Sequence, residues 1–138
     1  MDGTERRARV LVIDDDLDFV KIAMHFLQRE GFDSLGATSG IEGLSLLAKH
    51  RIDVILLDWM MPEMDGFMVL RELKKNPATA RIPVIVVTAR DDFHAHSQSM
   101  RLGAADLLAK PIFRKQLGDR VRLQVQMVAG LQAIYQTG

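Results

Sequence analysis

The sequence contains no cysteine, carries no net charge and has no long apolar run. The absence of cysteine excludes a disulfide framework, a thiol nucleophile and a metal site built from thiolates. Because 18 Lys and Arg residues balance 18 Asp and Glu residues, no overall charge draws the chain to nucleic acid or to a membrane. The apolar runs are far shorter than the roughly 18 residues of a membrane-spanning helix, and the start of the chain lacks the apolar segment of a signal peptide. We therefore expect a cytoplasmic protein without direct contact to nucleic acid or membrane.

The 138 residues predict a single domain in which apolar runs alternate with helical patterns. The runs typical of buried strands are residues 8–13, 32–38, 54–57, 83–87 and 105–109, and the helical patterns are residues 17–30, 39–48, 66–75, 91–102 and 113–135. This alternation predicts a parallel sheet with helices on both faces. We predict the flavodoxin-like (βα)5 arrangement, a doubly wound α/β sheet with strand order 2-1-3-4-5, because it brings the first, third and fourth strands together.

Polar residues and glycines are placed to begin or end the predicted helices. Asp16, Ser39 and Asp91 precede helical patterns and are expected to act as N-caps, and we interpret Asp16 as a cap rather than a metal ligand. Gly31 and Gly103 are expected to end helices. The apolar face of the second helix is expected to consist of Ile41, Leu44, Leu47 and Ala48.

The stretch 54–66, VILLDWMMPEMDG, places a charge at the end of an apolar strand. Val54 to Leu57 are apolar on both faces, as expected for a strand buried in a parallel sheet, and the run ends abruptly at Asp58. Two interpretations are open at this point. Asp58 either caps the helix that begins near Gly66, or it belongs to a functional site, since ligands bind at the carboxyl ends of strands in open α/β sheets.

The predicted strand order brings a set of charged and polar groups to one edge of the sheet. The groups that follow strands there are Asp14, Asp15, Asp58, Thr88 and Lys110. Three crowded carboxylates repel one another, and a hard divalent cation such as Mg²⁺, which prefers oxygen ligands, relieves this conflict. Lysine and threonine suit a phosphoryl group, the first by charge and the second by hydrogen bonding. Together these residues favour phosphoryl transfer to a carboxylate.

Four short motifs then point to a known family. The motifs are DD at 14–15, DxxMPxMDG at 58–66, TA at 88–89 and KP at 110–111. In this order and spacing the chain resembles the receiver domain of bacterial two-component response regulators over residues 9–126. Residues 1–8 are then a polar lead-in, and residues 127–138 are a C-terminal helical extension or a linker.

The resemblance implies a signalling module rather than an enzyme. Asp58 would accept a phosphoryl group from a sensor histidine kinase or a histidine phosphotransfer protein, in a two-component system or phosphorelay. Lys110 would pair with that group, Thr88 would turn inward to bind it, and the backbone amide of Ala89 would donate to it. The resemblance also implies a cis bond between Lys110 and Pro111.

The same resemblance implies a set of metal ligands. Asp15, Asp58 and the backbone carbonyl of Met60 would hold Mg²⁺ directly, and Asp14 would act through a coordinated water. We expect Mn²⁺ to substitute for Mg²⁺. Hydrolysis of the phosphoryl group is expected to be slow, because Met60 cannot orient an attacking water and Arg90 is bulky enough to obstruct it.

Two other functions share parts of this pattern. A phosphatase of the haloacid dehalogenase class needs a second aspartate two residues after the nucleophile, but position 60 is methionine. A pseudo-receiver that binds partners without phosphorylation is the alternative we retain, although such a protein is expected to have lost one of the acidic, threonine or lysine positions. One departure from the family pattern is Leu107, which stands where an aromatic residue usually reports phosphorylation to partners.

The last helical pattern continues beyond the part that a receiver needs. Apolar residues and one glutamine follow alternating steps of four and three residues, which is typical of a helix that packs on another helix. These residues are Leu117, Val121, Gln124, Val128, Leu131 and Tyr135. We predict an extended C-terminal helix that mediates a homodimer, and the alternative is a frayed tail.

Overall fold

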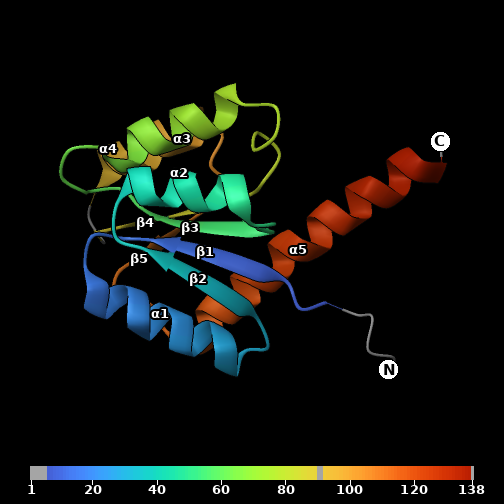
Figure 1. Cartoon of the computed structure of the whole chain (residues 1–138), viewed down its shortest axis with the longest axis horizontal. Helices are drawn as coiled ribbons and strands as arrows, with labels where there is room; N and C mark the ends of the chain where they lie inside the picture. Colours follow the sequence, from blue (N-terminus) through green and yellow to red (C-terminus); the bar gives the residue numbers. More distant parts are fainter. Residues whose placement is uncertain (1–5, 90–91, 138) are drawn as a thin grey trace.

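The structure, a computed structural model, describes residues 6–89 and 92–137, and the side chains as far as residue 134. Its centre is a sheet of five parallel strands (Figure 1). The strands are β1 (Arg9–Ile13), β2 (Asp33–Ala37), β3 (Val54–Asp58), β4 (Val84–Thr88) and β5 (Asp106–Ala109). Their order in the sheet is β2-β1-β3-β4-β5, so the predicted fold is confirmed.

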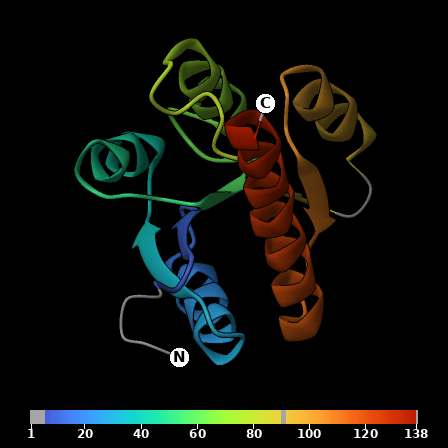
Figure 2. The same ribbon diagram turned by 90° about the vertical axis from the view of Figure 1, so that its right-hand side faces the viewer.

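Helices cover both faces of the sheet. They are α1 (Leu17–Arg29), α2 (Gly40–Lys49), α3 (Gly66–Lys75), α4 (Phe93–Arg101) and α5 (Arg114–Thr137). Figures 1 and 2 show α2, α3 and α4 on one face and α1 and α5 on the other. Within the described residues, no helix combines the length and the apolar character needed to cross a membrane.

The alternation of side chains along the strands divides the core into two halves. Leu11 and Ile13 of β1 belong to the cluster beneath α2, α3 and α4, whereas Val10 and Val12 belong to the cluster beneath α1 and α5. Strands β3 and β4 are buried along their whole length. This is why their sequences are apolar without alternation, and why a charged residue at the end of β3 stands out.

Each of the first four helices directly follows a residue whose side chain accepts a backbone N–H. These caps are Asp16, Ser39, Asp65 and Asp92 for α1 to α4 in turn. Asp92 therefore corrects the expectation for Asp91, which lies outside the described residues. Because Asp65 caps α3, capping does not explain Asp58, and the first interpretation of that residue was wrong. Gly31 and Gly103 end helices with positive φ, as predicted.

The buried face of α2 differs from the predicted one. Ile41 is 67% exposed and Ala48 is also exposed, whereas Leu44 and Leu47 pack against the core. The physical reason is Gly43, where an added Cβ would lie 2.5 Å from Cδ1 of Ile13. The helix approaches the sheet through this glycine, so the residues beside it turn inward and Ile41 turns to solvent.

Helix α5 has 24 residues and extends beyond the sheet. Leu117, Val121 and Gln124 in its first half are buried against the α1 side of the core. Figure 1 shows the second half projecting away from the body of the molecule. The predicted seam is therefore used for the core in its first half, and Leu131 further along is 55% exposed.

Candidate functional site

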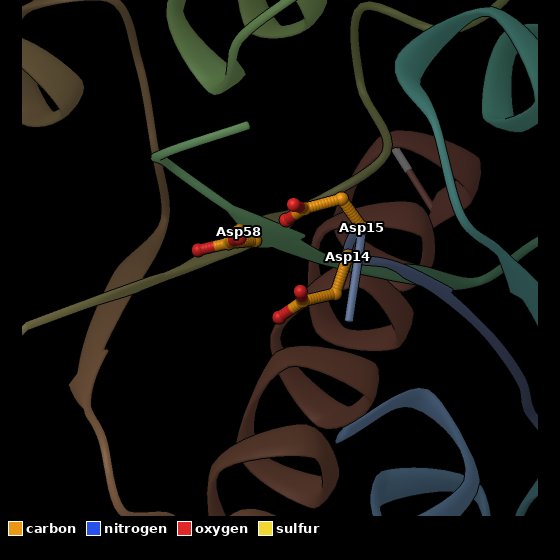
Figure 3. A group of neighbouring side chains, drawn as sticks. All are labelled: Asp14, Asp15 and Asp58. Carbon is orange, nitrogen blue, oxygen red and sulfur yellow. The ribbon is translucent and has the colours of Figure 1, made fainter. Parts of the chain in front are cut away.

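Three carboxylates meet where β1 and β3 end (Figure 3). Asp14 and Asp15 follow β1, Asp58 is the last residue of β3, and the two strands are neighbours in the sheet. One oxygen from each carboxylate lies within 4.8 Å of the others. Asp14 is 1% exposed and Asp58 is 6% exposed, while Asp15 faces solvent. The structure therefore brings two buried acids into contact range, which is unfavourable unless cations compensate.

Lys110 supplies the compensating charge from the end of β5. Its Nζ lies 3.0 Å from Oδ2 of Asp14 and 3.8 Å from Oδ1 of Asp58. The same Nζ lies 4.4 Å from the centre of the Phe19 ring, a distance suited to a cation–π contact. The Lys110–Pro111 peptide bond is cis, as the resemblance implied.

The surroundings shift the pKa of both charged partners. Burial, followed by the charge of Asp14, raises the pKa of Asp58 from 3.8 to about 7, although Lys110 and the Met60 amide act in the opposite direction. Burial alone would lower the pKa of Lys110, but its hydrogen bond to Asp14 and the nearby carboxylates outweigh burial and raise it. Asp14 and Asp58 thus face a single ammonium group, one positive charge fewer than two ionised carboxylates would need.

The backbone around Asp58 is held tightly. The amide of Trp59 donates to the Val87 carbonyl, and the amide of Gly66 donates to the Trp59 carbonyl. An added Cβ on Gly66 would lie 2.8 Å from the Asp58 carbonyl oxygen, so only glycine allows the loop to return so closely to the end of the strand. The loop therefore fixes the backbone from which the Asp58 side chain projects.

Thr88 and Ala89 lie at the same edge of the sheet as the carboxylates, at the end of β4. Thr88 ends β4, is buried, and donates its hydroxyl to the Ala89 carbonyl at 3.1 Å. Ala89 is exposed next to it. Leu107 is half-buried and packs on the cluster beneath α2, α3 and α4.

Of the two residues expected to slow hydrolysis, Met60 lies within the described residues and Arg90 does not. The Met60 side chain is 68% exposed, while its amide donates to Asp58. Arg90 lies outside the described residues, so slow hydrolysis stays a prediction.

Sequence reasoning missed one residue of the site, Phe19. Nothing in its local pattern indicates a neighbour 91 positions away. The contact depends on the fold, which places the first turn of α1 beside the end of β5. The only sequence signal was an aromatic residue shortly after the acidic run 14–16.

The donor atoms of the cluster suit a hard divalent cation. The three side chains offer carboxylate oxygens only, and nitrogen or sulfur ligands are absent from this group. Mg²⁺ and Mn²⁺ prefer such oxygens. Burial and the charge of Asp14 both raise the pKa of Asp58, and a bound cation would favour its ionised form, so the residues present fit the metal.

Comparison with known proteins identifies the family. A family model described as the response regulator receiver domain matches residues 10–122. The chain belongs to this family. This receiver domain is 43% identical over 115 residues to the response regulator PleD of Caulobacter vibrioides, covering 83% of the chain and 25% of PleD. It is 36% identical over 105 residues to the protein PilH of Pseudomonas aeruginosa, covering 76% of the chain and 87% of PilH.

Solved structures support the same assignment. A response regulator receiver domain protein from Clostridium thermocellum matches the receiver domain with a TM-score of 0.83 at 31% identity, covering 90% of this chain and 98% of that one. The chain spans a quarter of PleD but most of PilH. The fold and the family are thus established. The activities of the relatives as whole proteins are properties of those proteins.

Proposed function

We propose that this receiver domain accepts a phosphoryl group on Asp58 from the phosphohistidine of a sensor histidine kinase or a histidine phosphotransfer protein, with Mg²⁺ bound. The observation that carries this proposal is that two buried carboxylates, Asp14 and Asp58, share the single ammonium group of Lys110. An oxygen of ionised Asp58 attacks phosphorus, the P–N bond breaks, and its electron pair returns to the histidine ring, which takes up a proton. The product is an acyl phosphate on Asp58.

The side chains around Asp58 would stabilise the negative charge that arrives. Lys110 needs only a small shift from Asp14 to reach a phosphoryl oxygen, because its Nζ is already 3.8 Å from Asp58. The Thr88 hydroxyl would exchange its hydrogen bond to the Ala89 carbonyl for one to the phosphoryl group, and the Ala89 amide would donate to the same group. With Leu107 in place of an aromatic residue, this movement of Thr88 carries the signal to the neighbouring loop and α4.

Asp15, Asp58 and the backbone carbonyl of Met60 would hold the metal directly. Asp14 suits an indirect role through water, because its Oδ1 accepts the Asp16 amide at 2.9 Å and its Oδ2 accepts Lys110 at 3.0 Å. When bound, Mg²⁺ supplies the positive charge that offsets the carboxylates and the phosphoryl oxygens. Mn²⁺ should serve in its place.

The proposed output is a change in protein contacts, not the turnover of a substrate. We place the receiver domain, residues 9–126, in a cytoplasmic two-component system or phosphorelay, without direct binding to nucleic acid or membrane. Residues 127–138 are proposed to extend the last helix and to mediate a homodimer. A pseudo-receiver would show the same fold without phosphorylation, so phosphorylation is the property to test.

Intact mass spectrometry tests the proposal. Incubation with acetyl phosphate and Mg²⁺ should add one phosphoryl group, and Asp58→Asn should abolish the addition. Asp65→Asn is the matched control, because asparagine caps a helix as well as aspartate does and should keep α3 intact. Equal labelling of wild type and Asp58→Asn would refute the assignment, and no labelling of wild type under any phosphodonor would favour the pseudo-receiver.

A further inference from the structure

A groove of about 680 Å³ runs along β2, the outermost strand of the sheet on the side of α1. Its lining includes Arg9 and Asp33, which pair at the starts of β1 and β2. The carboxylate cluster follows the opposite ends of the strands. The groove is thus a surface separate from the phosphorylation site, and its role does not rest on the function proposed above.

The floor of the groove is a strand edge that has a neighbour on one side only (Figure 1). The Asp33 amide donates to the Ala8 carbonyl, and the Ala37 carbonyl accepts the Asp14 amide, so Asp33 and Ala37 direct their backbone groups toward β1. In a parallel ladder alternate residues point to opposite sides, which directs the backbone N–H and C=O of Ser34 and Gly36 outward. Such a row of outward groups is a template for a further strand.

The walls of the groove come from both faces of the sheet. Lys21 and His25, four residues apart on α1, line one wall, and His50, which follows α2, lies on the other. Arg9 belongs to the second wall, because it has the same orientation as Leu11 and Ile13, which face α2. A slot that straddles a strand edge in this way fits an extended backbone, whose side chains alternate toward the two walls.

The charge of the lining selects the partner. Arg7, Arg9 and Lys21 contribute three permanent positive charges, and the only carboxylate of the lining is Asp33. The ion pairs found among the described residues use other cations. Because the whole chain has a formal net charge of zero, this surplus is local to the groove. Positive charge on both walls of a strand edge is complementary to acidic side chains on both faces of an added strand.

We propose that this groove binds an acidic, extended peptide segment of a partner protein, which adds to the sheet as a strand along β2. Backbone hydrogen bonds to Ser34 and Gly36 would give the segment its place, and Lys21 and Arg9 would recognise its carboxylates from the two walls. The interaction would occupy a face of the receiver domain that leaves Asp58 accessible.

Fluorescence anisotropy with a labelled peptide of alternating Glu and Val tests the charge component. The peptide should bind the full chain, and Lys21→Glu should weaken binding by at least about tenfold. Lys75→Glu, the same charge change on the exposed surface of α3, is the matched control and should change binding by less than about twofold. No binding of the peptide to wild type, or equal weakening by Lys75→Glu, would overturn the proposal.

Ser34→Pro tests the strand component. Proline removes the outward N–H without removing a ladder bond to β1, so the chain should still fold, while peptide binding should weaken by about tenfold. Ser34→Thr keeps the N–H and should bind like wild type. On wild type, the peptide should also slow hydrogen exchange of the Ser34 and Gly36 amides.

A change in the peptide tests the same backbone hydrogen bonds on wild type, so the test does not depend on the folding of the proline variant. A peptide of the same charge with N-methyl groups on alternate amides cannot form the ladder and should bind wild type about tenfold more weakly. Equal binding of both peptides, or no change in exchange at Ser34 and Gly36, would show charge attraction alone and overturn strand addition. Tighter binding of a single-stranded oligonucleotide that Ser34→Pro does not affect would also overturn it.

Discussion

Asp58 is a carboxyl group placed where its ionisation is unfavourable. Burial and the neighbouring charge of Asp14 raise its pKa to about 7, and one lysine serves both acids. A surface aspartate would be easier to accommodate but would not combine a nucleophilic oxygen with groups ready to receive a phosphoryl group. The instability of the ionised cluster is therefore the counterpart of the proposed binding of cations and a phosphoryl group.

This instability predicts a pH dependence of folding. Between pH 3.8, the ordinary pKa, and about 7, folded Asp58 binds a proton that the unfolded chain releases. The contribution of protonated Asp58 to stability is therefore complete below the lower value and is lost as the pH rises through about 7. Without metal, the free energy of unfolding should fall across this range in wild type, and Asp58→Asn should be more stable than wild type at about pH 8.

Urea unfolding in EDTA and in Mg²⁺ measures this effect. At ten times its Kd, Mg²⁺ should raise the free energy of unfolding of wild type by about 1.4 kcal/mol and leave Asp58→Asn nearly unchanged. Asp65→Asn, which keeps the cluster, should respond to Mg²⁺ as wild type does. A metal-free wild type that gains stability between about pH 5 and pH 8 relative to Asp58→Asn would contradict the raised pKa.

Phe19 is predicted to position Lys110. Its ring lies 4.4 Å from Nζ, and a contact of this kind is worth on the order of 1 kcal/mol. Phe19→Leu keeps an apolar side chain but removes the ring face, so phosphorylation by acetyl phosphate should slow by about fivefold. Phe19→Tyr keeps the ring and should restore the rate.

A second readout separates positioning from general loss of structure. With Lys110 less well placed, the pKa of Asp58, followed by carboxyl ¹³C chemical shifts, should rise further in Phe19→Leu. An unchanged pKa together with an unchanged rate would show that the ring does no more than fill space.

At the scale of elements, α5 is joined to the end of α1 by a charge cluster around Glu30. Arg122 donates to Oε1 of Glu30 at 2.9 Å, and Arg114 lies 3.3 Å from Oε2. Gly118 lies beneath this carboxylate, where an added Cβ would come within 2.3 Å of Oε1 and 2.7 Å of Cγ. A glycine inside a helix ordinarily weakens it, but Gly118 makes room for Glu30.

This arrangement predicts that the effect of Gly118→Ala on the free energy of unfolding changes sign when Glu30 is removed. Alanine favours a helix by about 1 kcal/mol over glycine, yet Gly118→Ala should lower the free energy of unfolding, because Glu30 must leave both arginines. In a Glu30→Ala background the same substitution should raise it. Gly130→Ala is the control, since nothing lies within 4 Å of its position, and it should not lower stability. Destabilisation of equal size in both backgrounds would show that Glu30 is not the cause.

The elements also show what the sequence could predict. Strands and helix caps are encoded over a few neighbouring residues, so their positions follow from local patterns. The strand order inferred from their alternation then predicts that Asp14, Asp58 and Lys110 converge at one edge of the sheet. The prediction for the inward face of α2 was wrong, because a pattern of apolar side chains does not reveal that a helix approaches the sheet through a glycine such as Gly43. Contacts between distant segments, such as Phe19 with Lys110, become visible only in the fold.

At the scale of the whole molecule, the second half of α5 stands apart from the core. Met127 and Leu131 are each about half exposed, at 53% and 55%, and their spacing of four residues places them along one side of the helix. Exposed apolar area costs roughly 25 cal/mol for each Å², which a second helix would remove. The extension therefore has a reason to self-associate.

We predict a weak or phosphorylation-dependent dimer formed through this extension. Sedimentation of the full chain should show association that increases with acetyl phosphate and Mg²⁺, and a chain ending at Gln126 should remain monomeric. Leu131→Glu should abolish association by placing a charge in the interface, whereas Ala129→Glu, about half a turn away on the helix, should leave it intact. Monomers in all samples would exclude the dimer, and equal loss in both point variants would place the interface elsewhere.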